Sequence, residues 1–303
     1  MAEPVPVKTQ LPIDNLRGAG WMIFSSAFFA MSYSASKYVA ADIPPPEVAF
    51  FRCLFGLAVI APFVVRQGFS VFHTKSPGVH LTRTVCAAIS LNLTYYALAN
   101  LPLATAISLS FTRPLFMILI AMAFLGEIVR WRRSIATIVG FIGVLVVLGP
   151  HGLDSLLAAS AALAGAAFTA GAVAVVRKQA GTDSAGTIMV WFATSTAIVT
   201  AIPAAFVWKT PPTLEAWAVL AFMGIVGTLG QYFMIRAFIH GEATVMNPID
   251  YSQILMSAVI GYIIFNEIPP ASLWMGAAII VGSTLYILLR ESRLKKASPP
   301  PHP

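Results

Sequence analysis

Charged residues are scarce in this chain of 303 residues: they make up 10% of it, whereas hydrophobic residues make up 58%. A soluble domain of this length needs a more polar surface, so the composition indicates a polytopic membrane protein. The net charge of +7 comes from Lys and Arg residues that are dispersed between apolar runs. Because no basic stripe is interleaved with aromatic residues, we expect the lipid bilayer as a partner and no nucleic acid.

Cysteine is nearly absent as well, since the chain has only Cys53 and Cys86, each inside an apolar run. Such thiols behave as small hydrophobic groups, and these two form neither a disulfide framework nor a C-x-x-C metal site. The sequence also lacks H-E-x-x-H, G-x-S-x-G and G-x-x-x-x-G-K-[ST] motifs. We therefore expect no enzyme, no cofactor, no metal site and no transport powered by the chain's own ATP hydrolysis.

Long apolar runs, in contrast, are abundant. A transmembrane helix needs about 17 to 25 largely apolar residues, and short loops rich in Pro, Gly or charge separate runs of that length. Ten such runs cover residues 18–40, 46–65, 80–99, 103–125, 132–149, 155–176, 186–208, 215–238, 244–265 and 271–290. The segment before the first run contains Glu3, Asp14 and several prolines, unlike the short basic start of a cleaved signal peptide. We expect the first helix to stay in the mature protein.

The basic residues predict the orientation of these helices, because cytoplasmic loops carry an excess of Lys and Arg. If the N-terminus is cytoplasmic, the other side of the membrane keeps only Lys37 and Lys209. The cytoplasmic side then holds Lys8, Arg17, Arg66, Lys75, Arg83, Arg130, Arg132, Arg133, Arg177, Lys178, Arg236, Arg290, Arg293, Lys295 and Lys296. The sequence thus predicts a multi-pass protein of the cell inner (plasma) membrane with both termini in the cytoplasm.

The two halves of the chain carry the same pattern of apolar run, glutamate and apolar helix. NLPLATAISLSFTRPLFMILIAMAFLGEI (100–128) aligns with HGEATVMNPIDYSQILMSAVIGYIIFNEI (240–268) without a gap, which places Glu127 on Glu267. Five helices per copy force the second copy into the opposite orientation. The predicted fold is all-α, with ten transmembrane helices in two inverted five-helix repeats around a central cavity. The repeats span 18–150 and 155–290, between a cytoplasmic segment (1–17) and a disordered cytoplasmic tail (291–303).

A set of short motifs accompanies this pattern: FFRCLFG, RPLFMILIAMAFLGE, GFIGVLVVLGP, GQYFMIRA, PIDY and NEIP. Together they resemble the drug/metabolite transporter superfamily, and its EamA-type ten-helix branch fits best. The resemblance covers nearly the whole chain. It implies a secondary transporter whose cavity is lined mainly by helices one, three, four, six, eight and nine. Substrates in this superfamily range from amino acids and opines to nucleotide-like cofactors, so the resemblance does not name the ligand. Arg113 departs from the pattern, because many relatives carry a small residue there.

Arg113 and Pro114 interrupt the fourth apolar run near its middle. A cation that faces lipid there costs about 2.5 to 3.5 kcal/mol, so we expect Arg113 to face a wet cavity or a counter-charge. The repeat supplies a carboxylate, since Ser110 aligns with Asp250 and Arg113 with Gln253. Two interpretations remain open: a substrate or coupling role for this pair, or an ion pair that only holds helix four to helix nine.

Proline at these positions also disturbs the helix backbone. Pro114 leaves the carbonyl of Ser110 without its helical partner, and Pro248 does the same to Thr244. Both carbonyls become acceptors that a substrate could use.

Further polar residues lie within the predicted spans. Those expected to contribute to substrate binding, besides Ser110, Arg113, Asp250 and Gln253, are Tyr251, Gln231, Tyr232, Asn92, Tyr95, Tyr33 and Asn247. Tyrosine has an apolar face and a hydroxyl, which suits an amphipathic metabolite, although tyrosines also gather at membrane interfaces. Arg236 is more typical of a positive-inside anchor.

Three other features favour structural roles. Arg52, near the outer end of helix two, is placed to snorkel or to bind a helix end. Glu127 and Glu267 follow helices four and nine, where we expect them to accept hydrogen bonds from the first amides of the following helix. The small residues of helix five (Ala136, Gly140, Gly143) and of helix ten (Gly276, Gly282, Ser283) allow close helix contact within a monomer.

The predicted function is secondary transport of a small polar or zwitterionic metabolite by alternating access. Export of an amino acid or related metabolite is the commonest role that the resemblance implies. Uptake of a cofactor such as riboflavin or S-adenosylmethionine is the alternative, and a membrane scaffold or enzyme is a remote one. We expect a monomer or weak homodimer and a coupling proton.

Overall fold

The computed structural model describes residues 14–68, 72–74, 76–124, 131–148, 155–179, 183, 185–241 and 243–297. Its regular structure, over those residues, is helical throughout. The helices are α1 (Asn15–Val39), α2 (Pro45–Gln67), α3 (Pro77–Asn100), α4 (Leu103–Ser110), α5 (Arg113–Phe124), α6 (Trp131–Leu148), α7 (Leu156–Gln179), α8 (Ala185–Phe206), α9 (Leu214–His240), α10 (Ala243–Asp250), α11 (Ser252–Phe265) and α12 (Ala271–Ala297).

Capping side chains and prolines determine where several helices begin. Asp14 Oδ1 accepts a hydrogen bond from the Arg17 amide at the start of α1, and Thr213 Oγ1 accepts one from the Ala216 amide at the start of α9. Both caps satisfy amides that have no partner within their helix. Pro45 and Pro77 open α2 and α3, at positions where a missing amide hydrogen costs nothing.

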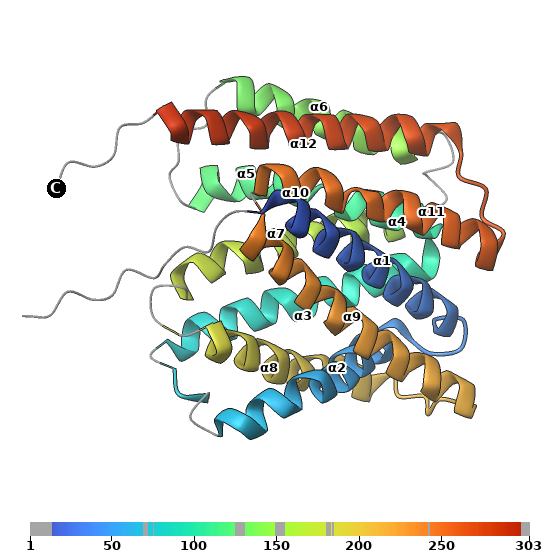
Figure 1. Ribbon diagram of the computed structural model, residues 1–303. Coiled ribbons are helices and arrows are strands. Elements are labelled where there is room, and N and C mark those ends of the chain that lie inside the picture. The colour runs from blue at the N-terminus through green and yellow to red at the C-terminus, as the bar shows by residue number, and fades with distance from the viewer. Residues whose placement is uncertain are drawn as a thin grey trace, which may run out of the picture.

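The helices run side by side in one bundle (Figure 1). The α6–α12 pair lies along one edge, α2 packs on α8 at the opposite edge, and the remaining helices lie between them. Within that middle layer, α1 packs mainly on α9 and α3 mainly on α7. α1 also contacts α3, α4, α10 and α11, so it occupies the centre of the bundle.

Most helices are strongly apolar, and α1 differs from them in its buried polar residues. Among the described residues, five helical stretches are long and apolar enough to cross a membrane: Pro45–Arg66, Leu103–Ile120, Leu156–Val175, Thr187–Phe206 and Leu214–His240. Shorter apolar helices cover Ile135–Leu148, Ser252–Phe265 and Ala271–Tyr286. α1 is more polar, because Ser25, Ser26, Ser32, Ser34 and Ser36 are buried along it. A helix that hides its hydroxyls from lipid belongs in the interior of a membrane bundle.

Two of the predicted spans each consist of two helices. The run 103–125 divides into α4 and α5 at Phe111 and Thr112, and the run 244–265 divides into α10 and α11 at Tyr251. The bend at Phe111 is tight, since its amide donates to both Ile107 O and Ser108 O. Pro114 and Pro248 lie within three residues of these two breaks.

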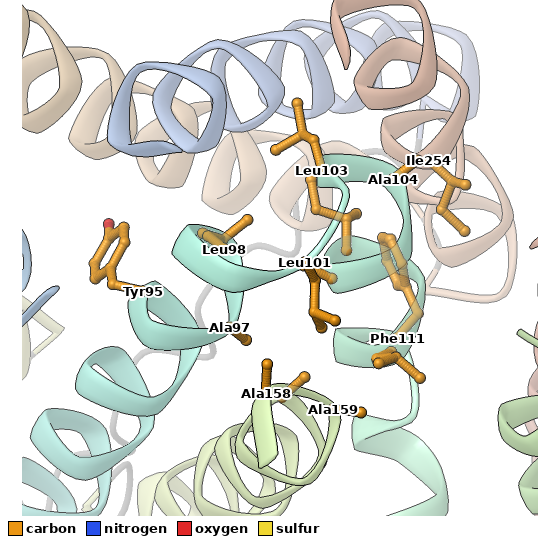
Figure 2. Close-up of a cluster of buried hydrophobic side chains, with 14 of the residues drawn as sticks. Tyr95, Ala97, Leu98, Leu101, Leu103, Ala104, Phe111, Ala158, Ala159 and Ile254 are labelled. Atoms are coloured by element: carbon orange, nitrogen blue, oxygen red, sulfur yellow. The ribbon is translucent and has the colours of Figure 1, made fainter. Parts of the chain in front are cut away.

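A cluster of buried apolar side chains surrounds the first break (Figure 2). It joins Leu98 and Leu101 near the end of α3 to Leu103 and Phe111, with Ala158 of α7 and Ile254 of α11 closing it. This packing fixes α4 against three neighbouring elements.

Small residues bring α6 and α12 together, as the sequence predicted for Gly143 and Gly276. A Cβ atom on Gly276 would lie 2.5 Å from the Val147 amide nitrogen and 2.6 Å from Gly143 O. The prediction for Gly282 is wrong, because a Cβ there would have no neighbour within 4 Å.

These two glycines of α12 make a matched test of the α6–α12 contact. Gly276→Ala forces the backbones apart, so we expect its melting temperature in detergent to fall, at a cost of about 1 to 3 kcal/mol. Gly282→Ala should leave the melting temperature unchanged or raise it slightly, because alanine favours the helix. Equal melting temperatures for the two variants would contradict this contact.

Candidate functional site

The two helix breaks lie next to each other in space. The rings of Phe111 and Tyr251 are in an edge-to-face contact with centroids 5.0 Å apart, a favourable aromatic geometry. The contact therefore joins the break between α4 and α5 to the break between α10 and α11. Arg113 follows the first break and Asp250 precedes the second, which brings the predicted acid and base to one region of the bundle.

Arg113 is only half-buried and interacts with its own helix. Its Nε donates to Ser110 O over 3.1 Å, and its guanidinium carbon lies 5.7 Å from the centre of the Phe111 ring. The carbonyl that Pro114 leaves without a partner is thus present, as predicted, but Arg113 itself occupies it. The Ser110 hydroxyl donates to Ile107 O over 2.7 Å, so this hydroxyl is turned to the backbone as well.

Asp250 lies at the end of α10, against the centre of α1. The Ser26 hydroxyl is 3.4 Å from Asp250 Oδ1 and 3.5 Å from its carbonyl oxygen, which are long and weak hydrogen bonds. Arg113 is close enough for a charge–charge interaction with this carboxylate. Arg113 and Asp250 do not form an ion pair, however. The two ion pairs within 4.0 Å among the described residues are Lys37–Glu267 and His80–Asp183. The arrangement is that of two opposite charges that face one region without binding each other.

The other predicted site residues differ in how deeply they are buried. Tyr33, Tyr251 and Gln231 are half-buried, while Tyr95 and Gln253 are buried. Asn92 donates to Ala88 O within its own helix, although its side-chain oxygen is buried without a partner. Tyr232 lies on the outward side of α9, where 47% of it is exposed and its ring packs on Phe233. Asn247 belongs to α10, and its side chain lies outside the described part of the structure, as does Glu127.

Glu267 does not have the role that the sequence predicted. Its Oε2 accepts a hydrogen bond of 2.7 Å from the Leu103 amide at the start of α4, and not from the helix that follows it. Its Oε1 pairs with Lys37 Nζ at 2.5 Å, and the same Nζ lies 2.5 Å from Leu101 O. The expectation failed because the first turn of α4 is closer in space, although it lies in the other half of the chain. We call this set of contacts the Lys37 latch.

The Lys37 latch closes one end of the bundle, where α1, α3 and α11 finish. A small hollow beside it is lined by Pro102, Thr105, Gly261 and Pro269, among others. α4 packs on α11 at this end, whereas α5 and α10 share no interface of similar extent in the described parts of those helices. The sequence offered one signal of the latch, since Lys37 is one of only two basic residues on the predicted outer side.

The described side chains also bear on metal binding. No group of three or more His, Cys, Asp or Glu residues that could hold a metal ion occurs within the described ranges. The Asp183 carboxylate, which accepts from Thr74 and contacts His80 Nε2 at 2.9 Å, is a local cluster at the end of the bundle opposite the Lys37 latch.

Comparison with known proteins decides the family. The sequence matches the EamA-like transporter family twice, over residues 16–149 and 157–289. The chain belongs to this family. It is thereby a member of the drug/metabolite transporter superfamily, which confirms the resemblance seen in its motifs. As an EamA-like transporter it is a multi-pass membrane protein.

Several EamA-like relatives extend over nearly the whole chain. An S-adenosylmethionine uptake transporter of Rickettsia conorii is 34% identical over 92% of this chain and 94% of its own length. A riboflavin transporter of Vibrio cholerae is 30% identical over 92% and 95%, and a pseudopaline exporter of Pseudomonas aeruginosa is 30% identical over 90% and 95%. One crystal structure aligns over 91% of this chain and 98% of its own, with a TM-score of 0.63 and 20% identity, and shows the same fold.

The Lys37 latch can be tested by its effect on access to the residues behind it. Glu267→Gln removes the ion pair, which is worth about 1 kcal/mol for side chains that are partly exposed, or about fivefold in an opening equilibrium. We therefore expect an impermeant thiol reagent to label a cysteine at Ala104 at least several times faster in Glu267→Gln, with Cys53 and Cys86 replaced by alanine.

Glu215→Gln is the control for this experiment. Glu215 accepts a hydrogen bond from Tyr38 over 2.9 Å at the same end of the bundle, but it does not contact α4. It should leave the labelling rate unchanged. An equal effect of both substitutions would show that surface charge, and not the latch, governs access.

Proposed function

We propose that this EamA-like protein is a secondary transporter that takes up a small, charged, cofactor-like metabolite across the inner membrane by alternating access. The observation that supports this proposal most is that Asp250 and Arg113 lie near the two adjacent helix breaks without forming an ion pair. Opposite charges held apart in a membrane bundle are costly unless a ligand completes them. A zwitterionic or cationic metabolite supplies the missing partners.

The recurrence of helix boundaries supports an architecture of ten spans in two inverted repeats. A shift of 140 residues moves α4 (Leu103–Ser110) onto α10 (Ala243–Asp250) and the first residue of α6 onto that of α12. The same shift places Phe111 on Tyr251, so the two break residues that contact each other are repeat counterparts. Contact between counterparts is expected at the pseudo-two-fold axis, where transporters of this kind bind their substrates.

Differences between the two repeats support an inward-facing state. The contact of α4 with α11 has its counterpart in the contact of α5 with α10, and only the former is extensive within the described helices. With both termini cytoplasmic, α4 and α11 meet at the outer side, where the Lys37 latch lies. The bundle is therefore closed outside, and movement of α5 toward α10 would close it inside.

The relatives bear on the direction and the substrate. Sequence alone favoured export of an amino acid or a related metabolite, but S-adenosylmethionine and riboflavin uptake transporters stand among the most similar proteins. S-adenosylmethionine carries a sulfonium and an ammonium group that suit Asp250, so it is the first candidate. Because a pseudopaline exporter is also among the relatives, export of a zwitterionic metabolite is the second candidate function.

Transport by charge variants tests this proposal. Proteoliposomes with the wild-type protein should accumulate labelled S-adenosylmethionine, and Asp250→Asn and Arg113→Gln should each lower the rate by about tenfold or more, as expected for lost charge-assisted hydrogen bonds. Both variants should be folded, with melting temperatures near that of the wild type, because no ion pair is broken.

The double variant and the charge exchange separate this role from a structural one. Neither Arg113→Gln with Asp250→Asn nor Arg113→Asp with Asp250→Arg should recover transport. Loss of stability in the single variants that returns in the double variant would identify a structural pair instead. Wild-type uptake by either single variant would remove that residue from the site.

The orientation can be tested by thiol labelling from each side. A cysteine at Ser76, Ser134 or Ser184 should react with an impermeant reagent only from the cytoplasmic side, and one at Thr213 or Asp154 only from outside. A mixed pattern would contradict the ten-span topology and the assignment of the Lys37 latch to the outer side.

A further inference from the structure

A second cation, the half-buried Arg52 of α2, lies next to hydroxyl groups from other helices. Its guanidinium is next to the Tyr33 and Tyr95 side chains, from α1 and α3. A fourth helix, α9, approaches the guanidinium with Gly227. A Cβ atom on this glycine would lie 3.4 Å from both Nε and Nη2 of Arg52, and 2.7 Å from the Ser32 hydroxyl. A Cβ atom at Gly227 would touch the guanidinium and would clash with the Ser32 hydroxyl.

The polar groups of this cluster are incompletely satisfied. Tyr95 is 1% exposed, and its hydroxyl lies beside the Arg52 guanidinium without a hydrogen bond of good geometry. Its oxygen points away from the apolar cluster of Leu98, Leu101 and Ala158 (Figure 2). Among the described residues, no carboxylate lies within 4.0 Å of Arg52. A half-buried cation without a carboxylate partner, next to a buried hydroxyl without a well-formed hydrogen bond, is costly in a membrane bundle, which indicates a ligand with negative charge.

The position of the cluster along α1 relates it to Asp250. Ser26 contacts Asp250 and Tyr33 lies within electrostatic range of Arg52, and these two residues lie seven positions apart on one face of α1. Seven residues of helix span about 10 Å. Phe29 lies between them, with its ring stacked on that of Tyr33 at 6.0 Å. An acidic group, an aromatic surface and a cation thus follow one another along the central helix.

We propose that Arg52, Tyr33 and Tyr95 form an anion subsite that binds a carboxylate of the transported metabolite. The inference deepens the proposed function and rests on it, because it adds the substrate class: an elongated molecule with a cationic group for Asp250, a ring beside Phe29 and Tyr33, and a carboxylate for Arg52. The guanidinium and the Tyr95 hydroxyl donate to the carboxylate oxygens, which relieves both uncompensated groups. The Lys37 latch lies one helical turn from Tyr33, toward the end of α1.

Matched probes that differ only in the anion test the subsite by binding, without transport. The pairs are S-adenosylmethionine with its decarboxylated analogue, methionine with methioninamide, and, for a phosphate, flavin mononucleotide with riboflavin. Affinities are measured by calorimetry on the purified protein in nanodiscs. We expect the wild type to bind at least one carboxylate-bearing probe about tenfold or more tightly than its partner, the usual effect of a charged hydrogen bond.

Variants assign this preference to its residues. Arg52→Gln should abolish the preference and leave the affinity of the partner that lacks the anion unchanged. Tyr95→Phe should reduce the preference, and Arg52→Lys should retain part of it. Arg66→Gln is the matched control, because Arg66 has the same charge and is exposed at the other end of α2. It should behave as the wild type.

Four outcomes would overturn the inference. They are no preference in any pair, a preference for the phosphate pair alone, a preference that survives Arg52→Gln, or an equal loss of affinity for both members of a pair. The last is expected of a purely structural arginine. Failure of the proposed uptake is distinguishable from all of these, since it would appear as absent flux in proteoliposomes while the carboxylate preference in nanodiscs remains.

Discussion

The edge-to-face contact of Phe111 with Tyr251 is the interaction around which the site is organised. Each ring belongs to a residue at which a membrane-embedded run stops being one continuous helix. Helices broken inside a bundle leave backbone groups and charges in a place that lipid cannot solvate, so the breaks must lie in the interior. Their contact holds Arg113 and Asp250 within electrostatic range while leaving them unpaired.

Charge in the interior also explains the composition of the central helix. α1 buries five serines. Along its length, Ser26 contacts the Asp250 carboxylate, Tyr33 lies near Arg52, and Lys37 pairs with the Glu267 carboxylate. Ser26, Tyr33 and Lys37 lie on one side of this helix. In the proposed mechanism, α1 therefore connects the substrate-binding residues to the Lys37 latch. A ligand that binds Asp250 and Arg52 contacts residues packed on the same helix that contains Lys37.

Much of this arrangement could be predicted from the sequence, because bilayer thickness and the positions of Lys and Arg restrict the chain strongly. The offset between Glu127 and Glu267 also gave the register in which Phe111 and Tyr251 coincide. What could not be predicted is which side chains from distant parts of the chain contact each other. Glu267 binds the start of α4 and not its own following helix, and Arg52 lies among tyrosines and not at a helix end. Both depend on packing between distant segments, which no local pattern encodes.

Sided access to a cysteine at Ser110 tests the central claim most directly, since Ser110 lies beside the Phe111–Tyr251 contact. In a variant without Cys53 and Cys86, an impermeant thiol reagent is applied to either face of proteoliposomes with and without S-adenosylmethionine. The account predicts fast labelling from the cytoplasmic face in the ligand-free protein, and a shift toward the outer face when substrate is supplied from outside. Labelling from one face only under every condition, or equal labelling from both faces at all times, would contradict alternating access around this contact.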